Sequence, residues 1–415
     1  MKKILSVVLP AISFVALAAP EVSGVNVSVD AVRRTTTVSY SLSEDAVVTF
    51  DVLTNGVSIG GANLQGVVGD VNRRVEAGSR TLVWCWPQDL NGPQIPAAAT
   101  VRVTAWPLND LPDYIVCECS AGALSFYANA ESIPGGVGDD RYKTDYLVLR
   151  RIPAKGVIWQ MGSPESETGR AGDSEARHRV TFTNDYYMGI YEVTQRQYER
   201  AMGIGDITTD TSEGEFPISI TNAPTYPLDG ARWVMTRSAH PSWNWAPPDQ
   251  MPRGGSSAFI LGKLSGKTGF TFDLPTEAEW EYACRAGEGA ARYDGTGDSS
   301  TLGDLAWYAA NAGGAIHPVG LKKPNRWGLY DMYGNVPEWC LDWYSPEIGG
   351  SGDSVVTNPV GPTASSPTLY NHVARGGSIA SSADSLRSAA RVGRNLGTKV
   401  GSGFRMVALN VSLAE

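Results

Sequence analysis

The chain has 415 residues, of which 42% are hydrophobic and 19% are charged, and its formal net charge is −9. This composition excludes a disordered chain, and the acidic balance excludes the basic surface that binds nucleic acid. A chain of this length exceeds one ordinary hydrophobic core, so we expect two domains.

Met1–Ala19 has the pattern of an export signal. Lys2 and Lys3 precede a nearly apolar run, Ile4–Leu17, and Ala16-Leu17-Ala18 is a small-x-small cleavage pattern. The run is short for a membrane span of ~20 residues, which argues against the alternative of a membrane anchor. No later segment has enough apolar residues to cross a bilayer. We therefore expect export to the periplasm or to the cell exterior.

The cysteine count limits the disulfide framework. Five cysteines in an exported chain leave at least one of them unpaired within the chain. A bridge within Cys117-x-Cys119 is strained, a bridge from Cys85 to one of these two is easier to form, and the pairing stays open. Zinc sites normally use more ligands at CxxC spacing, and no such set occurs. The four histidines, at positions 178, 240, 317 and 372, are scattered.

Residues 20–112 have the pattern of an all-β domain. Apolar residues alternate in Val25–Val29, and β-branched residues are frequent in four further expected strands, Thr35–Leu42, Ala46–Leu53, Arg80–Trp86 and Thr100–Trp106. Thr54-Asn55-Gly56 is a hairpin-type turn. Strands at this spacing predict a β-sandwich of immunoglobulin or fibronectin type. The pattern carries no chemistry, and spacing, docking and carbohydrate contact stay open as roles.

Residues 113–145 are predicted to be a connector with a strand at Tyr114–Cys119, and residues 146–415 to form the second domain. The second domain mixes isolated strands, a few short helices and long loops, and loops that long usually carry function or a metal. Its expected helices are Val193–Gly203, Ser256–Leu264 and Pro275–Gly287.

Two of these helices carry capping boxes, in which Thr194 pairs with Gln197 and Thr276 pairs with Glu279. Cys284 shares a helix face with Trp280, which favours a core residue over a nucleophile.

Asn325–Trp343 concentrates acidic and aromatic residues around a turn at Gly334-Asn335. A hard cation binds carboxylate oxygens together with backbone carbonyls of an irregular loop. Asp331, the carbonyls of Gly334 and Val336, and Glu338 could form such a site. The alternative is a solvated acidic turn beneath an aromatic core, since acidic turns are common.

A series of motifs in the second domain resembles the formylglycine-generating enzyme, or sulfatase-modifying factor, family. In chain order they are Ile152-Pro-Ala-x-Gly156, Met161-Gly-Ser163, Tyr191-Glu-Val-Thr194-x-x-Gln197-Tyr198, Leu274-Pro-Thr-Glu-Ala-Glu-Trp-Glu-Tyr282, Gly328-Leu-Tyr-Asp-Met332, Gly334-Asn-Val-x-Glu-Trp339, Arg375-Gly-Gly-Ser378, Arg387-Ser-Ala-Ala-Arg391 and Gly403-Phe-Arg405. The resemblance covers about residues 146–409 and keeps the family's order. It implies the family's variant of the C-type lectin fold, with little regular secondary structure.

The resemblance also implies one calcium site. Its ligands would be the Asp331 and Glu338 side chains and the Gly334 and Val336 carbonyls. Pro337 stands where the family commonly has an aromatic residue. A second family calcium loop would fall near Ala306–His317, where the donors do not align, so we do not predict it.

The resemblance breaks at the family's catalytic thiols. Family enzymes oxidise a substrate cysteine to formylglycine with oxygen and a copper-binding pair of cysteines, which lie after the Gly-Gly-Ser motif. Here that interval, Ile379–Leu386, has no cysteine, and none follows Cys340. Ser381 or Ser382 lies near the position of the first thiol, and a hydroxyl cannot replace a thiolate as a soft-metal ligand, so copper is not expected. A serine nucleophile would need a base, and His372 has no evident third partner.

Other motif residues are expected to have structural roles. Arg375, Arg391 and Arg405 should pair with acidic side chains or loop carbonyls, because a guanidinium presents a fork of donors. Gly376-Gly377 should allow close backbone approach. Glu175 and His178 precede an expected strand and could link loops. A non-heme iron site drawn from His178, His240 or His317 with an acid has no supporting spacing.

Three hypotheses of function follow. The first is an exported, calcium-stabilised binding or accessory protein that has lost catalysis and binds a peptide, protein or glycan, sulfatases among them. The second is an active oxidoreductase that matures sulfatases by another route. The third is a C-type lectin-like ligand-binding protein with a variable loop, in which Ile379–Thr398 would vary among sister copies while Asn325–Trp343 would not. The oligomeric state and the ligand do not follow from the sequence.

Overall fold

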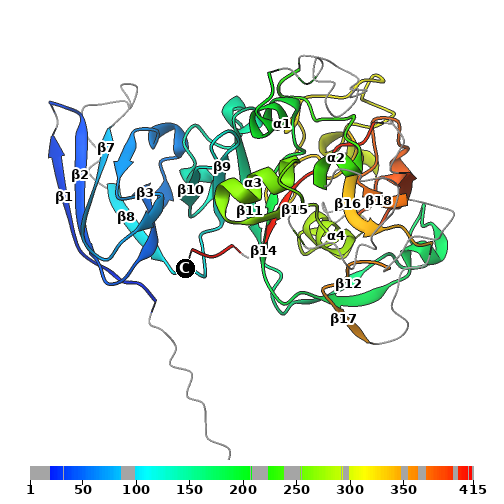
Figure 1. Ribbon diagram of the computed structural model, residues 1–415, viewed down its shortest axis with the longest axis horizontal. Coiled ribbons are helices and arrows are strands. Elements are labelled where there is room, and N and C mark those ends of the chain that lie inside the picture. The colour runs from blue at the N-terminus through cyan, green and yellow to red at the C-terminus, as the bar shows by residue number, and fades with distance from the viewer. Residues whose placement is uncertain are drawn as a thin grey trace, which may run out of the picture.

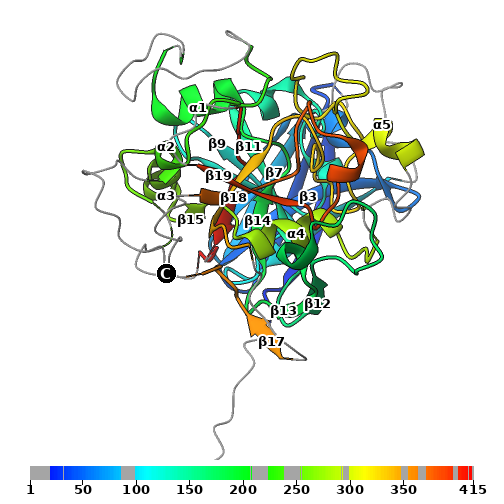
Figure 2. The same ribbon diagram turned by 90° about the vertical axis from the view of Figure 1, so that its right-hand side faces the viewer.

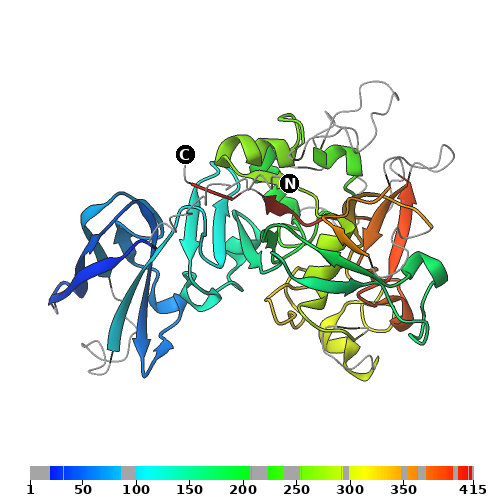
Figure 3. The same ribbon diagram turned by 90° about the horizontal axis from the view of Figure 1, so that it is seen from below.

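The computed structural model describes residues 19–30, 32–85, 99–205, 207, 223–237, 253, 255–290, 292, 299–346, 354–362, 371–395, 401–409 and 411–413. A β-rich N-terminal domain lies at one end of the molecule, and a larger domain of sheets, short helices and loops lies at the other (Figures 1 and 3). Of the predicted export segment, Met1–Ala19, residues 1–18 lie outside the described part.

The N-terminal domain is built from two antiparallel sheets. The first has the order β1 (Val22–Asp30), β2 (Thr35–Leu42), β7 (Gly78–Cys85) and β5 (Val67–Gly69). In the second, β3 (Ala46–Thr54) pairs with β8 (Ala99–Trp106), β4 (Val57–Ser58) and β6 (Arg73–Val75).

One core lies between these two sheets. Val38 and Leu82 from the first sheet and Phe50 and Val52 from the second belong to the same buried cluster. The predicted β-rich N-terminal domain is therefore confirmed, and its assignment to the immunoglobulin or fibronectin type stays a prediction.

The C-terminal domain is organised around a six-stranded antiparallel sheet. Its order is β10 (Leu124–Tyr127), β9 (Tyr114–Glu118), β11 (Tyr146–Ile152), β14 (Tyr186–Gly189), β20 (Val407–Leu409) and β15 (Thr271–Asp273). The segment 113–145 thus contributes two strands to this sheet, in addition to connecting the domains.

The described part of this domain also contains two three-stranded sheets. One contains β12 (Ile158–Met161), β13 (His178–Thr181) and β17 (Val355–Thr357), and Figure 2 shows it at the lower edge of the domain. The other contains β16 (Glu338–Trp343), β18 (Asn371–Arg375) and β19 (Arg391–Asn395).

The α-helices of the described residues are short, and two of them begin at predicted caps. They are α1 (Gln195–Met202), α2 (Trp233–Arg237), α3 (Ile260–Thr268), α4 (Glu277–Arg285) and α5 (Leu302–Leu305). Both predicted capping boxes, at Thr194 and Thr276, are present. The expected helix Ser256–Leu264 instead starts at Ile260, because Ser256–Phe259 form a turn in which Phe259 N–H donates to Ser256 O, and it ends at the left-handed Gly269.

Aromatic side chains fill the core behind these elements. The imidazole of His372 is buried between the rings of Trp233 and Trp343, with centroid separations of 3.9 and 4.0 Å. All five cysteines carry free thiols, and only Cys85 is exposed. Among the described helices, none is long and apolar enough to cross a bilayer.

Candidate functional site

The turn between Asp331 and Glu338 needs residues that adopt the left-handed backbone conformation. Asp331, Gly334 and Asn335 have φ values of 54°, 76° and 53°. A Cβ on Gly334 would lie 2.0 Å from the carbonyl oxygen of Trp307, so this position accepts only glycine. Asn335 N–H donates to that same carbonyl oxygen at 2.8 Å. The turn is thus held against the backbone of residue 307.

Three buried carboxylates gather beneath this turn, on Glu192, Asp331 and Glu338. Both oxygens of Glu338 accept from Arg405, at 2.6 and 2.7 Å, and one also accepts from the Trp280 indole N–H at 2.7 Å. Glu192 accepts from the Asn335 amide at 2.7 Å and from Val336 N–H at 3.2 Å. The Arg405 guanidinium thus forms an ion pair with Glu338, and Glu192 and Asp331 interact with its charge at longer range.

Burial opposes the ionisation of two of these carboxylates, Asp331 and Glu192. Burial raises the pKa of Asp331 to about 6. Burial, followed by the charges of Asp331 and Glu338, raises the pKa of Glu192 well above its ordinary value. Uncompensated negative charge in a buried site is relieved either by protons or by a bound cation.

Several oxygens of the turn have unused capacity to accept. Asp331 Oδ2 accepts from Gly320 N–H at 2.6 Å, while the buried Asp331 Oδ1 has no hydrogen-bond partner in the described structure. Over the same residues, no hydrogen bond reaches the carbonyl oxygens of Gly334 and Val336. Glu338 Oε1 accepts one hydrogen bond and keeps a second lone pair. Four oxygens with room for another partner fit the preference of calcium for carboxylate and carbonyl ligands.

The segment after Gly376-Gly377 forms a serine-rich turn where the family has its thiols. Ser381 Oγ accepts from Ser378 N–H at 2.9 Å. The exposed hydroxyl of Ser382 lies 2.8 Å from that of Ser385. His372 lies elsewhere, because its Nδ1 is 3.0 Å from the carbonyl oxygens of Leu341 and Asp342. Ser381 and His372 therefore do not form a nucleophile–base pair.

Four of the five thiols are buried, on Cys117, Cys119, Cys284 and Cys340. Burial raises the pKa of Cys117 and of Cys284 to about 12, and the pKa values of the other two well above the ordinary range. Cys284 Sγ lies 3.7 Å from Ser388 Oγ in the core. These groups persist as neutral thiols, which are poor ligands for copper.

Buried arginines connect the surrounding loops. Arg391 forms a bidentate pair with Glu277 at 2.6 and 2.7 Å, and Arg375 contacts Glu277 at 2.7 Å and Glu281 at 3.0 Å. Arg387 similarly pairs with Glu175, at 2.7 and 2.8 Å. Such bidentate pairs fix the relative positions of segments that are distant in sequence.

The two described histidines that were considered as iron ligands, His178 and His317, each contact a backbone carbonyl oxygen. His178 Nδ1 lies 3.0 Å from Ala176 O, and His317 Nε2 lies 3.0 Å from Ala312 O. His240 lies outside the described residues. Within the described part of the chain, no three His, Cys, Asp or Glu side chains are grouped so that they could hold a metal ion. Any cation at the Asp331 turn would therefore depend on backbone carbonyls as well as carboxylates.

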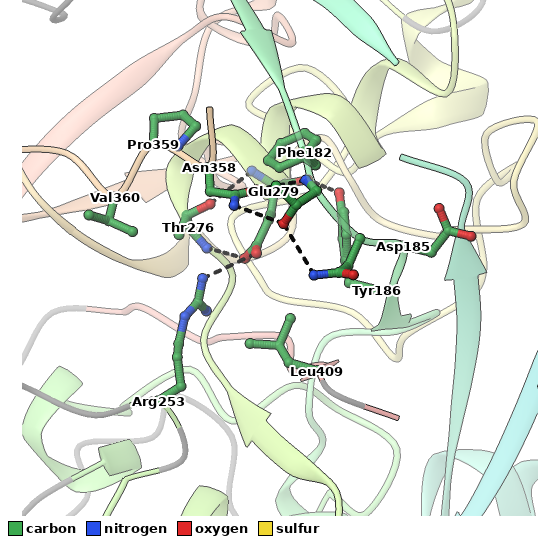
Figure 4. Close-up of a pocket in the computed structure, with 12 residues that line it drawn as sticks. Phe182, Asp185, Tyr186, Arg253, Thr276, Glu279, Asn358, Pro359, Val360 and Leu409 are labelled. Atoms are coloured by element: carbon green, nitrogen blue, oxygen red, sulfur yellow. Dashed lines mark hydrogen bonds and ion pairs between the residues drawn. The ribbon is translucent and has the colours of Figure 1, made fainter. Parts of the chain in front are cut away.

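A cavity of about 260 Å³ lies beside the first turn of α4 (Figure 4). Several polar groups of its lining bind each other. Arg253 donates to Glu279 at 3.1 Å, and Thr183 N–H donates to the Asn358 side chain at 3.0 Å. Sequence reasoning missed this cavity, because it forms between segments far apart in the chain. It also gave no role to Glu192, although Glu192 stands in the Tyr191–Thr194 motif.

Comparison with known proteins gives a consistent family. The model of the sulfatase-modifying factor enzyme 1-like domain matches residues 151–409. The chain is 26% identical over 312 residues to the formylglycine-generating enzyme of Mus musculus, covering 62% of this chain and 73% of that enzyme. It is 31% identical over 184 residues to the chaperone protein LppX of Paenibacillus barcinonensis, covering 39% of this chain and 64%, less than two thirds, of that protein.

Among solved structures, PvdO from Pseudomonas aeruginosa is similar with a TM-score of 0.46 and 25% identity, over 63% of this chain and 94% of that chain. The family match covers most of the C-terminal domain and contains the turn, the serine segment and the buried arginines. The chain belongs to the sulfatase-modifying factor, or formylglycine-generating enzyme, family through residues 151–409.

Proposed function

We propose that this protein is an exported, calcium-stabilised binding or accessory protein that uses the family scaffold without making formylglycine. The observation that carries the proposal is the serine segment, in which Ser381 stands near the first thiol position of the family and no cysteine follows Cys340.

The chemistry of the family reaction supports the loss of catalysis. Formylglycine formation in the family uses two thiolates that bind copper, and a serine hydroxyl supplies neither the soft ligand nor the redox partner. The buried thiols elsewhere cannot substitute, because burial disfavours their thiolate forms.

Calcium in this proposal has a structural role. The Asp331 and Glu338 side chains and the Gly334 and Val336 carbonyls would hold it, and its positive charge would offset the buried carboxylates. The residues then act together: Arg405 neutralises Glu338, Asn335 connects the turn to Glu192, and Gly334 lets the turn approach residue 307.

Two observations support the binding role: the exposed serine segment, and a relative that is not named as a formylglycine-generating enzyme. Ser382 and Ser385 present hydroxyls at the surface, which suit hydrogen bonding to a peptide or a glycan. One similar protein is named a chaperone, so the scaffold also occurs in proteins that are not named as formylglycine-generating enzymes. A sulfatase polypeptide is the first partner to test.

The test separates binding from conversion. The purified protein is incubated with a sulfatase-type CxPxR peptide, copper(I) and oxygen, and the peptide is analysed by mass spectrometry and by reaction with a hydrazide. We expect an unchanged cysteine, with an active formylglycine-generating enzyme as the positive control. Aldehyde formation would instead establish the active oxidoreductase.

Calorimetry with the same peptide tests the accessory role. Saturable binding without conversion supports a role in sulfatase maturation. Absence of binding argues against sulfatases as partners and directs the search to glycans.

A further inference from the structure

A second cavity lies on the other side of the loop that follows β17. Pro359 and Val360 line both this cavity and the one in Figure 4. The second cavity has a volume of about 330 Å³, and Met161, Ala278 and Val356 give it largely apolar walls. A pocket of this size and character, with a few polar groups, is typical of a site for a small ligand.

Asp342, in β16, contributes a buried carboxylate to this cavity and is only 3% exposed. Its Oδ2 accepts from Glu277 N–H at 2.8 Å. Over the described residues, its Oδ1 receives no hydrogen bond and Asp342 forms no ion pair. Burial, followed by the charge of Glu277, raises the pKa of Asp342 to about 7, as expected for a carboxylate without a cationic partner.

Gly361 lets the loop after β17 (Val355–Thr357) pack closely beside this carboxylate. A Cβ at position 361 would lie 3.0 Å from Asp342 Oδ1 and 2.9 Å from Asp342 Cβ. The loop therefore passes close to Asp342 without placing a side chain against it.

His178 gives the cavity a second acceptor. The ring is 4% exposed and lies at the start of β13. Its Nδ1 is 3.0 Å from Ala176 O, and a carbonyl oxygen can only accept, so Nδ1 carries the proton. In the neutral ring, Nε2 is then an acceptor, and none of the described residues donates to it.

The remaining charged groups of the wall are satisfied. Arg391 and Glu277 pair with each other, and Arg391 also donates to Ser345 O at 2.7 Å. The two open groups, Asp342 Oδ1 and His178 Nε2, are both acceptors. A complementary ligand must bring hydrogen-bond donors, and the uncompensated carboxylate favours a cation.

We propose that this cavity binds a primary ammonium group on a short apolar chain. Asp342 Oδ1 and His178 Nε2 accept hydrogen bonds from the ammonium, and the apolar walls at Met161 and Val356 enclose the chain. An ammonium has three donors, which suits two acceptors in one pocket. The largely apolar walls suit the carbon chain of an organic cation and not a hydrated metal ion. The ligand could be a free alkylamine or a lysine side chain, which share this chemistry.

Calorimetry at about pH 8 with the full chain tests the site. The probes are n-pentylammonium, its isosteres 1-pentanol and pentanoate, and Nα-acetyl-lysine methylamide. We expect saturable binding of n-pentylammonium, at least tenfold tighter than that of 1-pentanol, and no binding of pentanoate. If the lysine derivative binds, the natural ligand is a lysine side chain. If only n-pentylammonium binds, the natural ligand is a free alkylamine. Absence of saturable n-pentylammonium binding, or equal binding of 1-pentanol, would overturn the proposal.

Variants assign the binding to this cavity. Asp342→Asn keeps the size and the acceptor for Glu277 N–H but removes the charge, and should weaken n-pentylammonium at least tenfold with little effect on 1-pentanol. Asp304→Asn, which changes an exposed carboxylate in α5, should leave binding unchanged.

A cavity-filling variant covers the case in which Asp342→Asn does not fold. Val356→Phe, in β17, places a larger side chain in the wall and should abolish binding of both n-pentylammonium and 1-pentanol. Unchanged n-pentylammonium affinity in either folded variant contradicts the assignment. The result is independent of formylglycine formation, so it does not depend on the proposed function.

Discussion

The C-terminal domain contains buried ion pairs between single arginine and glutamate side chains. The bidentate pair of Arg405 and Glu338 has almost no exposure to water, and Arg405 also donates to Tyr330 O at 2.9 Å. Removing one member of such a pair leaves a buried charge without its partner, which costs more than the pair itself contributes.

Arg405→Ala should therefore lower the free energy of unfolding by about 3–5 kcal/mol. Urea denaturation measures the change. Arg200→Ala breaks an exposed pair with Asp145 and should cost at most ~1 kcal/mol, since water screens that pair. If both variants lose the same free energy of unfolding, the buried pair contributes no more to stability than the exposed pair.

Asp342 predicts a pH dependence of stability. Its folded-state pKa, about 7, lies above the ordinary value of 3.8. Between about pH 4 and pH 7 the folded chain holds a proton that the unfolded chain has released, so stability is lost as the pH rises through this window. Asp342→Asn should flatten the pH profile of the free energy of unfolding by on the order of a few kcal/mol. Asp384→Asn, at an exposed site, should keep the wild-type slope, and an unchanged slope in Asp342→Asn would contradict the shift.

At the scale of elements, capping rules predicted where α1 and α4 start, but the sequence did not predict how the strands pair. The caps of α1 and α4 follow from side chains within four residues of each other, which a sequence displays directly. The pairing of β14 with β20 joins residues 187 and 408, and β13 pairs in parallel with β17, residues 179 and 355. Contacts at such separations depend on the whole domain. For the same reason, sequence reasoning gave no role to Asp342 and did not link His178 to it.

Gly334 tests whether the turn before β16 is sterically determined. Gly334→Ala places a Cβ 2.0 Å from Trp307 O at a φ of 76°, and should reduce stability by far more than the ~1–2 kcal/mol cost of a left-handed alanine. Gly314→Ala is the matched control, because Gly314 has a φ of 77° and no atom within 4 Å of the added Cβ. Gly314→Ala introduces backbone strain alone, whereas Gly334→Ala adds a steric clash with Trp307 O. Thermal unfolding measures both variants, and equal melting temperatures would show that the clash is absent.

At the scale of the whole molecule, the two domains share part of their packing. Val47 of β3 belongs to the same buried cluster as Leu111, Ile115 and Leu147. Phe126 N–H also donates to Asn72 O across the boundary at 3.1 Å. The C-terminal domain nevertheless keeps its own larger aromatic core, around the Asp331 turn.

Calcium should consequently stabilise one domain and not the other. We expect saturating calcium to raise the unfolding temperature of the C-terminal domain and a chelator to lower it. At a calcium concentration one hundred times Kd, the free energy of unfolding should increase by ~2.7 kcal/mol. Differential scanning calorimetry measures both transitions. Asp331→Asn should abolish the response and Asp384→Asn should retain it, whereas identical traces with and without calcium would refute the metal site.

The contact that closes the boundary between the domains has a consequence for biogenesis. Leu413 N–H donates to Leu108 O, and Leu413 O accepts from Arg74, 339 positions earlier. The contacts of Val47 and Asn72 with the second domain need only residues up to 147, whereas these two hydrogen bonds can form only after residue 413 has been synthesised. During translation, the boundary between the domains can therefore begin to form early, and the C-terminal segment adds its two hydrogen bonds last.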